Sequence, residues 1–127
     1  MKQALLSLLL MITLVAYAQD KPGRTISGLS HAEGELKAAL NNKTLHNVVD
    51  QKVTLVKDSV TAIAIAEPVL FSVYGKENII NQKPYDIYHI KKYWVISGTL
   101  PVDTMGGTFL IIIDDRNGAI VRITHGK

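Results

Sequence analysis

Histidines and acidic residues are the side chains here that could do acid–base or metal chemistry near neutral pH. Histidine mostly does so when a second histidine or a carboxylate lies close by. The histidines are spread one to a segment, and no two have the i, i+4 helical spacing or the alternating strand spacing of local metal ligands. They are His31, His46, His89 and His125. We therefore interpret them as surface or partly packed side chains, and we predict no metal ion.

Asp86 and His89 could still meet a distant partner group in the fold. The sequence supplies none of the usual partners: no serine stands in a Gly-x-Ser-x-Gly turn, no paired catalytic carboxylates are evident, and there is no cysteine. Gly98, Gly106 and Gly107 are not followed by a helix, so a strand bend and a loop explain them better than a phosphate cradle. We predict a protein that is not an enzyme and binds no cofactor.

The N-terminus is typical of a secretory signal peptide. Lys2 precedes an apolar run over residues 4–15, and Ala16-Tyr17-Ala18 fits a small-residue cleavage site, so we expect cleavage after Ala18. The run is shorter than the roughly 20 apolar residues that span a membrane, and no other segment approaches that length. The signal predicts a periplasmic or secreted protein with no membrane span after cleavage. Without cysteine, packing alone must hold the exported domain.

The mature chain has the size and charge of one nearly neutral domain. Residues 1–18 are the signal peptide and residues 19–29 an extended leader, which leaves residues 30–127 for a single domain. Without Lys2 the chain carries 13 basic and 11 acidic residues, a formal charge of +2. The basic residues are scattered, so the concentrated field of a nucleic-acid groove is missing, and we predict no nucleic-acid partner.

Two helices are expected in the first half of the domain. Ser30 and Glu33 fit a capping box that opens a short helix through Leu40, which Asn41-Asn42 would end. Residues 53–56 are too few for periodicity to decide between a strand and an extended approach, and we interpret them as extended. The main helix begins at Asp58-Ser59, and its apolar residues recur at three- and four-residue spacing. They are Ile63, Ala66, Leu70 and Val73.

The composition of the main helix also indicates how it packs and where it ends. Its alanines permit close approach to a partner element, so we expect most of the helix to be buried. Pro68 removes one backbone bond, to the carbonyl of Ala64, and is expected to bend the helix. Gly75 is placed to end it in a left-handed conformation.

Two β-hairpins follow the main helix. Residues 85–90 and 93–100 alternate and are rich in aromatic and branched side chains, with Lys91-Lys92 between them. A two-residue turn would set Ile87 opposite Ile96 and His89 opposite Trp94. Residues 108–114 and 119–125 form the second hairpin around a turn that contains Asn117-Gly118, and its register stays open. The fold class is therefore α+β, with one or two helices on a curved antiparallel sheet of about four strands.

Several separated motifs in this order resemble the nuclear transport factor 2 fold immunity proteins of bacterial toxin systems. They are Ala64-Ile65-Ala66-Glu67-Pro68-Val69-Leu70, Tyr74-Gly75, Gln82-Lys83-Pro84-Tyr85, Tyr93-Trp94-Val95-Ile96-Ser97-Gly98-Thr99-Leu100-Pro101, Gly106-Gly107-Thr108-Phe109 and His125-Gly126-Lys127. The resemblance covers residues 61–127. It implies a cone-shaped domain that binds a cognate toxin of a polymorphic toxin system, and it carries over no contact residues.

The leading hypothesis is an exported immunity-type protein that neutralises its toxin by covering the active surface. Aromatic residues and arginine are the usual anchors of such interfaces. By residue type and strand position, the candidates are Tyr85, Tyr88, Tyr93, Trp94 and Arg122.

Two other hypotheses remain open. Related folds also host isomerases and dehydratases with polar groups deep in the cone, so a small-ligand binder or degenerate enzyme would use a pocket of about 300 Å³ or more. The residues to consider there are Tyr85, Asp86, Tyr88 and His89, although alternating aromatic residues usually pack and a fold alone confers no activity. The third hypothesis is an envelope protein that pairs through a sheet edge with another chain or as a homodimer.

Overall fold

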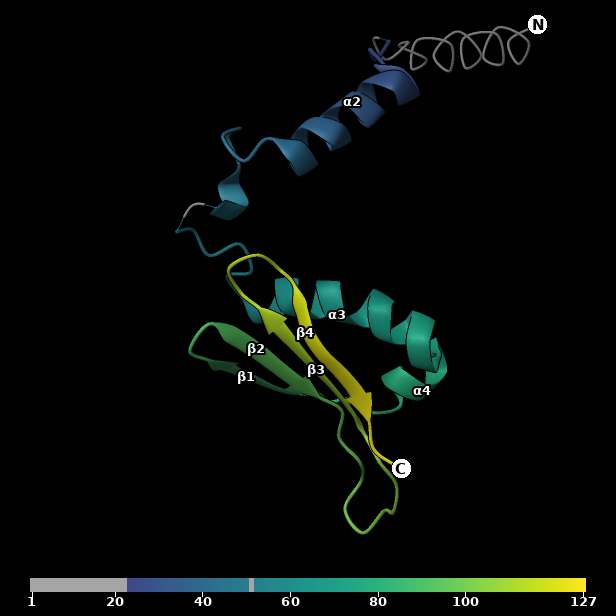
Figure 1. The fold of residues 1–127 in the computed structure, drawn as a ribbon. Coiled ribbons are helices and arrows are strands. Elements are labelled where there is room, and N and C mark those ends of the chain that lie inside the picture. Colours follow the sequence, from purple (N-terminus) through teal and green to yellow (C-terminus); the bar gives the residue numbers. More distant parts are fainter. Residues whose placement is uncertain (1–22, 51) are drawn as a thin grey trace, which may run out of the picture. The chain divides into compact units, whose positions relative to one another are not determined.

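The computed structural model describes residues 23–50 and 52–127. The described residues fall into two units, one within residues 23–45 and one within residues 46–127, which we describe separately (Figure 1). The expected signal peptide and the first part of the leader lie outside the described residues. Among the residues that are described, no helix is both long and apolar enough to cross a membrane.

The first unit contains the helix α2, Gly28–Asn41. The expected capping box is wrong, because the helix begins two residues before Ser30 and no side chain caps its first turn. Ser30 therefore lies within the first turn of the helix and cannot act as its N-cap. The predicted end is confirmed: the N–H of Asn42 donates to the Ala38 carbonyl at 2.8 Å. None of the α2 side chains, all of which are described, is buried.

An extended segment leads into the sheet domain of the second unit. A short 3₁₀ helix, η1, spans Val48–Asp50. The N–H groups of Leu55 and Val56 both donate to the Asp115 carbonyl at 2.9 Å, and Val56 is buried. The expectation of an extended approach is confirmed. These bonds attach the segment to the turn of the second hairpin.

The main helix, α3, spans Ser59–Tyr74 as predicted. Its first turn is capped by Asp58, whose Oδ1 accepts the Thr61 N–H at 2.8 Å. Gly75 ends it at φ +88°, a conformation that glycine adopts without strain. Pro68 and Ala64 are both exposed, so the carbonyl that the proline leaves unpaired can bond water.

The expectation that most of α3 is buried is wrong. Only one stripe of α3 is buried, and its members are Ala62, Ala66 and Leu70. Val60 and Val73 are 75% and 56% exposed, because α3 contacts the sheet from one side only. A short helix that the sequence did not reveal, α4, follows at Lys76–Ile80 and buries Ile79.

Four antiparallel strands form one sheet in the order β1-β2-β3-β4. They are β1, Asp86–Ile90; β2, Tyr93–Ser97; β3, Phe109–Asp114; and β4, Ile120–His125. The predicted pairs of the first hairpin, Ile87 with Ile96 and His89 with Trp94, are confirmed. In the second hairpin, Ile111 pairs with Ile123, and the register shifts between Ile112 and Ile113.

Helices α3 and α4 pack on one side of this sheet (Figure 1). The core joins the α3 stripe, Val56 and Ile79 to the covered strand positions Trp94, Ile96, Phe109, Ile111 and Ile113. Strand alternation sends the intervening side chains to the opposite side. The predicted α+β class, with helices on an antiparallel sheet, is confirmed.

Gln82 connects the end of α4 to the sheet. Its buried side chain accepts the Phe109 N–H through Oε1 at 2.9 Å and donates to the Asn78 carbonyl at 3.2 Å. A Cβ at Gly98 would stand 2.2 Å from that Oε1, so only glycine fits beside the glutamine. Gly98 therefore serves packing.

Candidate functional site

The side of the sheet opposite α3 carries an apolar and aromatic patch, with Asp86, Ser97 and Thr124 beside it on the same side. Residues paired across neighbouring strands point to the same side, so Tyr88, Val95, Ile112 and Arg122 form one row across all four strands. We call this surface the open face; it consists of Tyr88, Ile90, Tyr93, Val95, Leu110, Ile112 and Arg122. Tyr88, Ile90 and Arg122 are exposed, with Tyr88 and Ile90 at 58% and 53%, and the other four side chains are partly buried. An apolar centre with aromatic residues and an arginine is the composition of a protein-binding surface.

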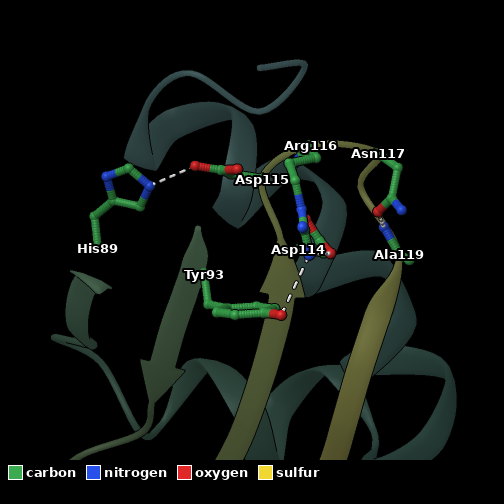
Figure 2. Close-up of polar contacts among 7 residues, drawn as sticks. All are labelled: His89, Tyr93, Asp114, Asp115, Arg116, Asn117 and Ala119. Carbon is green, nitrogen blue, oxygen red and sulfur yellow. Dashed lines mark hydrogen bonds and ion pairs between the residues drawn. The ribbon is translucent and has the colours of Figure 1, made fainter. Parts of the chain in front are cut away.

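Arg116 closes one end of the open face (Figure 2). Its Nε and Nη2 donate to the two carboxylate oxygens of Asp114 at 2.9 and 2.7 Å. Nη2 also donates to the Tyr93 hydroxyl at 3.3 Å, and the guanidinium lies 5.8 Å from the centre of the Tyr93 ring. These contacts hold the arginine in one orientation beside an aromatic residue of the open face. The hydrogen bonds from Arg116 hold the pKa of Asp114 below its ordinary value, and Asp114 in turn raises the pKa of Arg116.

The lowered pKa of Asp114 makes its contribution to stability depend on pH. A carboxylate whose pKa is lower in the folded than in the unfolded state stabilises the fold above its unfolded pKa of about 3.9, and this contribution is lost as the pH falls below that value. An amide does not titrate. We therefore expect the difference in unfolding free energy between wild type and Asp114→Asn to be largest near pH 7 and to shrink below about pH 4. Urea unfolding at pH 7, 5 and 3 measures this, and a difference independent of pH would contradict it.

His89, Trp94 and Asp115 form a second cluster on the covered side of the same sheet end. His89 Nε2 lies 2.7 Å from Asp115 Oδ2 (Figure 2). The imidazole also stacks on Trp94, with ring centres 4.4 Å apart. The indole Nε1 donates to the Val56 carbonyl at 2.9 Å. Asp115 is buried, and its Oδ1 has no hydrogen-bond partner among the described residues. The cluster ties the two hairpin turns to the extended segment.

In many catalytic sites a histidine acts as the general base and a buried carboxylate orients it. Among the described residues, no serine, threonine or lysine side chain forms a hydrogen bond with His89. The same part of the chain contains no group of three or more acidic residues or histidines that could hold a metal ion. His89 and Asp115 hold each other in place at this end of the sheet.

A pocket with a volume of about 300 Å³ lies beside these turns. We call it the basic pocket; its lining residues are Val49, Lys52, Val53, Thr54, Lys92 and Arg116. The volume of the basic pocket matches the small-ligand hypothesis, but its position does not. The pocket lies against the extended segment, whereas that hypothesis put the ligand in the cone between helix and sheet.

Comparison with known proteins identifies the family. The family described as NTF2 fold immunity protein (Imm-NTF2-2) matches residues 61–127, which include α3 from its third residue onward and the whole sheet. This chain belongs to that family. Two uncharacterized proteins of Escherichia coli strain K12 are also similar: YhhH is 36% identical over 74 residues and YbbC is 36% identical over 73 residues. The alignments cover 58% and 57% of this chain and 58% and 60% of those relatives, so the chain spans less than two thirds of their length. No solved structure matches.

Three of the five predicted anchors of this NTF2 fold immunity protein share the open face. Tyr88, Tyr93 and Arg122 lie there. Tyr85 and Trp94 lie on the covered side: the Tyr85 hydroxyl donates to Glu67 Oε2 at 2.9 Å, and its ring packs edge-on against Phe109. Burial, together with the bond to Glu67, raises the pKa of Tyr85. Contact with a partner stays a prediction for all five residues.

The residues considered for a site inside the cone do not converge. Tyr85 and His89 point to the covered side, whereas Asp86 and Tyr88 alternate with them and point to the open side. Sequence reasoning missed Arg116 and the lysines of the basic pocket. Arg116 follows Asp114, the last residue of β3. Asp114 pairs with Tyr93 of β2, and this pairing brings Arg116 beside the aromatic side chains of the open face. Because that pairing joins two different hairpins, the turn of neither hairpin predicts it.

Proposed function

We propose that this chain is an exported immunity protein that binds a cognate toxin domain of a polymorphic toxin system and neutralises it by covering its active surface. The proposal rests on the family membership of the chain together with the open face of its sheet. The signal peptide expected at residues 1–18 supports a toxin that arrives or acts in the periplasm, on the cell wall or the membrane.

The open face has the physical properties that this role requires. Tyr88 and Ile90 leave more than half of their surface in water, so a partner that covers them gains from the hydrophobic effect. The side chains project from paired strands whose backbones are already ordered, so binding costs little conformational entropy. Arg122 and Arg116 add donors at the edge of the apolar centre. Neutralisation by coverage needs no catalytic group of the immunity protein.

Cells that express a toxin domain encoded next to this chain provide the test. We expect wild type to protect such cells and the double variant Tyr88→Glu, Arg122→Glu to lose protection. The variant places a negative charge on each edge strand of the open face, on either side of its apolar centre, and we expect its affinity for the toxin domain to fall at least about 100-fold, or roughly 3 kcal/mol. Growth assays and calorimetry with the purified toxin domain measure both effects.

A matched control changes charge equally on another surface. Val60→Glu, Lys76→Glu alters exposed positions on α3 and α4 by the same three units of charge. We expect this control to protect as wild type does. An open-face variant that protects fully would refute this binding surface, and a wild-type chain that binds no such toxin domain would refute the function.

The basic pocket favours a second candidate function, the binding of a small anionic ligand. Its volume of about 300 Å³ is at the lower limit for ligand sites, and three of its six lining residues are cationic. The pocket opens beside Arg116, which also closes the open face, so the same groups could serve a protein partner.

A further inference from the structure

The basic pocket gathers three cations from three separate segments of the chain. Lys52 lies in the extended segment, Lys92 in the turn between β1 and β2, and Arg116 in the turn between β3 and β4. Backbone bonds hold these segments together: the Asp115 N–H donates to the Lys92 carbonyl at 2.9 Å, and the Asp115 carbonyl accepts the N–H groups of Leu55 and Val56. The backbones at Lys92 and Arg116 are therefore held together before any ligand arrives, and Lys52 lies three residues before the bonded Leu55.

Positive charge is in excess at this pocket. Asp114 is the acidic side chain that contacts Arg116, and no acidic side chain in residues 23–50 and 52–127 pairs with Lys52 or Lys92. Asp115, adjacent in sequence, turns to His89 instead. The three cations and Asp114 carry a formal charge of +2. Like charges focused in one concave site repel each other and attract an anion.

Arg116 has donors left for such an anion. Its bonds to Asp114 and Tyr93 use Nε and Nη2, so the two N–H groups of Nη1 remain available. The contact with the Tyr93 ring restrains the guanidinium. A carboxylate that met this group would bond to an arginine that has little rotamer freedom left to lose.

The remaining lining favours a carboxylate on an aliphatic stem. Val49 and Val53 are about half exposed and offer apolar walls next to the cations. A glutamate side chain combines methylene groups with a carboxylate and so matches both parts of the lining. Arg116 lines the basic pocket and also contacts Tyr93 of the open face, so the pocket adjoins one end of that face.

We infer that the basic pocket anchors an acidic segment of the toxin domain, with at least one glutamate or aspartate carboxylate bound among Lys52, Lys92 and Arg116. The inference rests on the proposed function and deepens it by naming the chemistry of the partner. In this arrangement the basic pocket contributes charge pairing to the interface, and the open face contributes apolar contact. Such a pairing steers association and sets the register of the two partners.

A titration of the full chain with a fluorescein-labelled hexaglutamate peptide tests the pocket without the toxin. We expect the peptide to bind, hexaglutamine not to bind, and Lys52→Gln, Lys92→Gln to weaken binding at least tenfold. The matched control Lys43→Gln, Lys127→Gln removes the same charge from exposed positions elsewhere and should change binding less than twofold. Equal weakening by both pairs would overturn the inference, since it would show attraction to overall charge alone.

Competition identifies the kind of anion. We expect N-acetylglutamate to displace the peptide at a lower concentration than inorganic phosphate does. The reverse order would assign the pocket to a phosphate-bearing small ligand and would overturn the inference.

A protection assay with the toxin domain distinguishes a wrong anchoring role for the basic pocket from a wrong proposed function for the chain. In protection assays we expect the Lys52→Gln, Lys92→Gln chain to need about ten times more protein than wild type. Full protection by this variant, with peptide binding lost, would overturn the anchoring role while leaving the proposed function intact. If wild type itself gives no protection, the proposed function fails and the peptide titration still reports on the pocket.

Discussion

Replacing Trp94 by alanine is expected to lower the free energy of unfolding by about 4 kcal/mol. The indole is 8% exposed, stacks on His89 and donates to the Val56 carbonyl at 2.9 Å. The alanine variant would leave a cavity at the sheet end and a buried carbonyl without its donor. The segment that carries Val56 would then lose one of its attachments to the sheet.

The measurement needs a probe other than intrinsic fluorescence, because Trp94 is the only tryptophan of the chain. Urea unfolding followed by far-UV circular dichroism reports the change. Trp94→Phe is the control: it keeps an aromatic ring against His89 and loses the N–H, so we expect a cost of about 1 to 2 kcal/mol. An alanine variant as stable as wild type that no longer binds the toxin domain would instead make Trp94 a partner anchor, as its residue type first indicated.

Two neighbouring isoleucines of β3 give the second large effect. Ile111 points to the core and is fully buried, whereas Ile112 lies on the open face and is only partly buried. We expect Ile111→Ala to lower the free energy of unfolding by about 3 kcal/mol and Ile112→Ala by about 1 kcal/mol. The substitution is chemically the same, so the difference measures which side of the sheet α3 covers.

Toxin binding should show the opposite order. Ile112→Ala removes part of the open face, so we expect weaker binding from a stable protein. Ile111→Ala leaves the open face intact and should bind normally at temperatures where it is folded. Equal destabilisation by both variants in urea unfolding would contradict the assignment of the two faces.

Local patterns accounted for much of the fold. Asp58 and Gly75 bound α3 because a capping side chain and a left-handed glycine act within one turn of the helix. The register of the first hairpin followed from the length of its turn at Lys91-Lys92. The start of α2 was misplaced, because the first turn of a helix can form without a side-chain cap.

The candidate site was less accessible to sequence reasoning than the elements around it. Tyr88 and Trp94 were equally good anchors by residue type, and strand alternation placed them on opposite sides of the sheet. The run of residues 109–113 is apolar throughout, so no pattern within it indicates a buried side. Only the packing of α3 against one side of the sheet distinguishes the buried side chains of this run from those on the open face.

The sequence by itself determined the order of helix and hairpins and the residue types at the sheet, because caps, turns and alternation act over a few neighbouring residues. The family was indicated by the resemblance of several separated motifs. The tertiary structure alone decided which side of the sheet is covered and that Lys52, Lys92 and Arg116 line one pocket. Those outcomes depend on backbone bonds and packing between segments that are distant in the chain. No local pattern encodes such contacts.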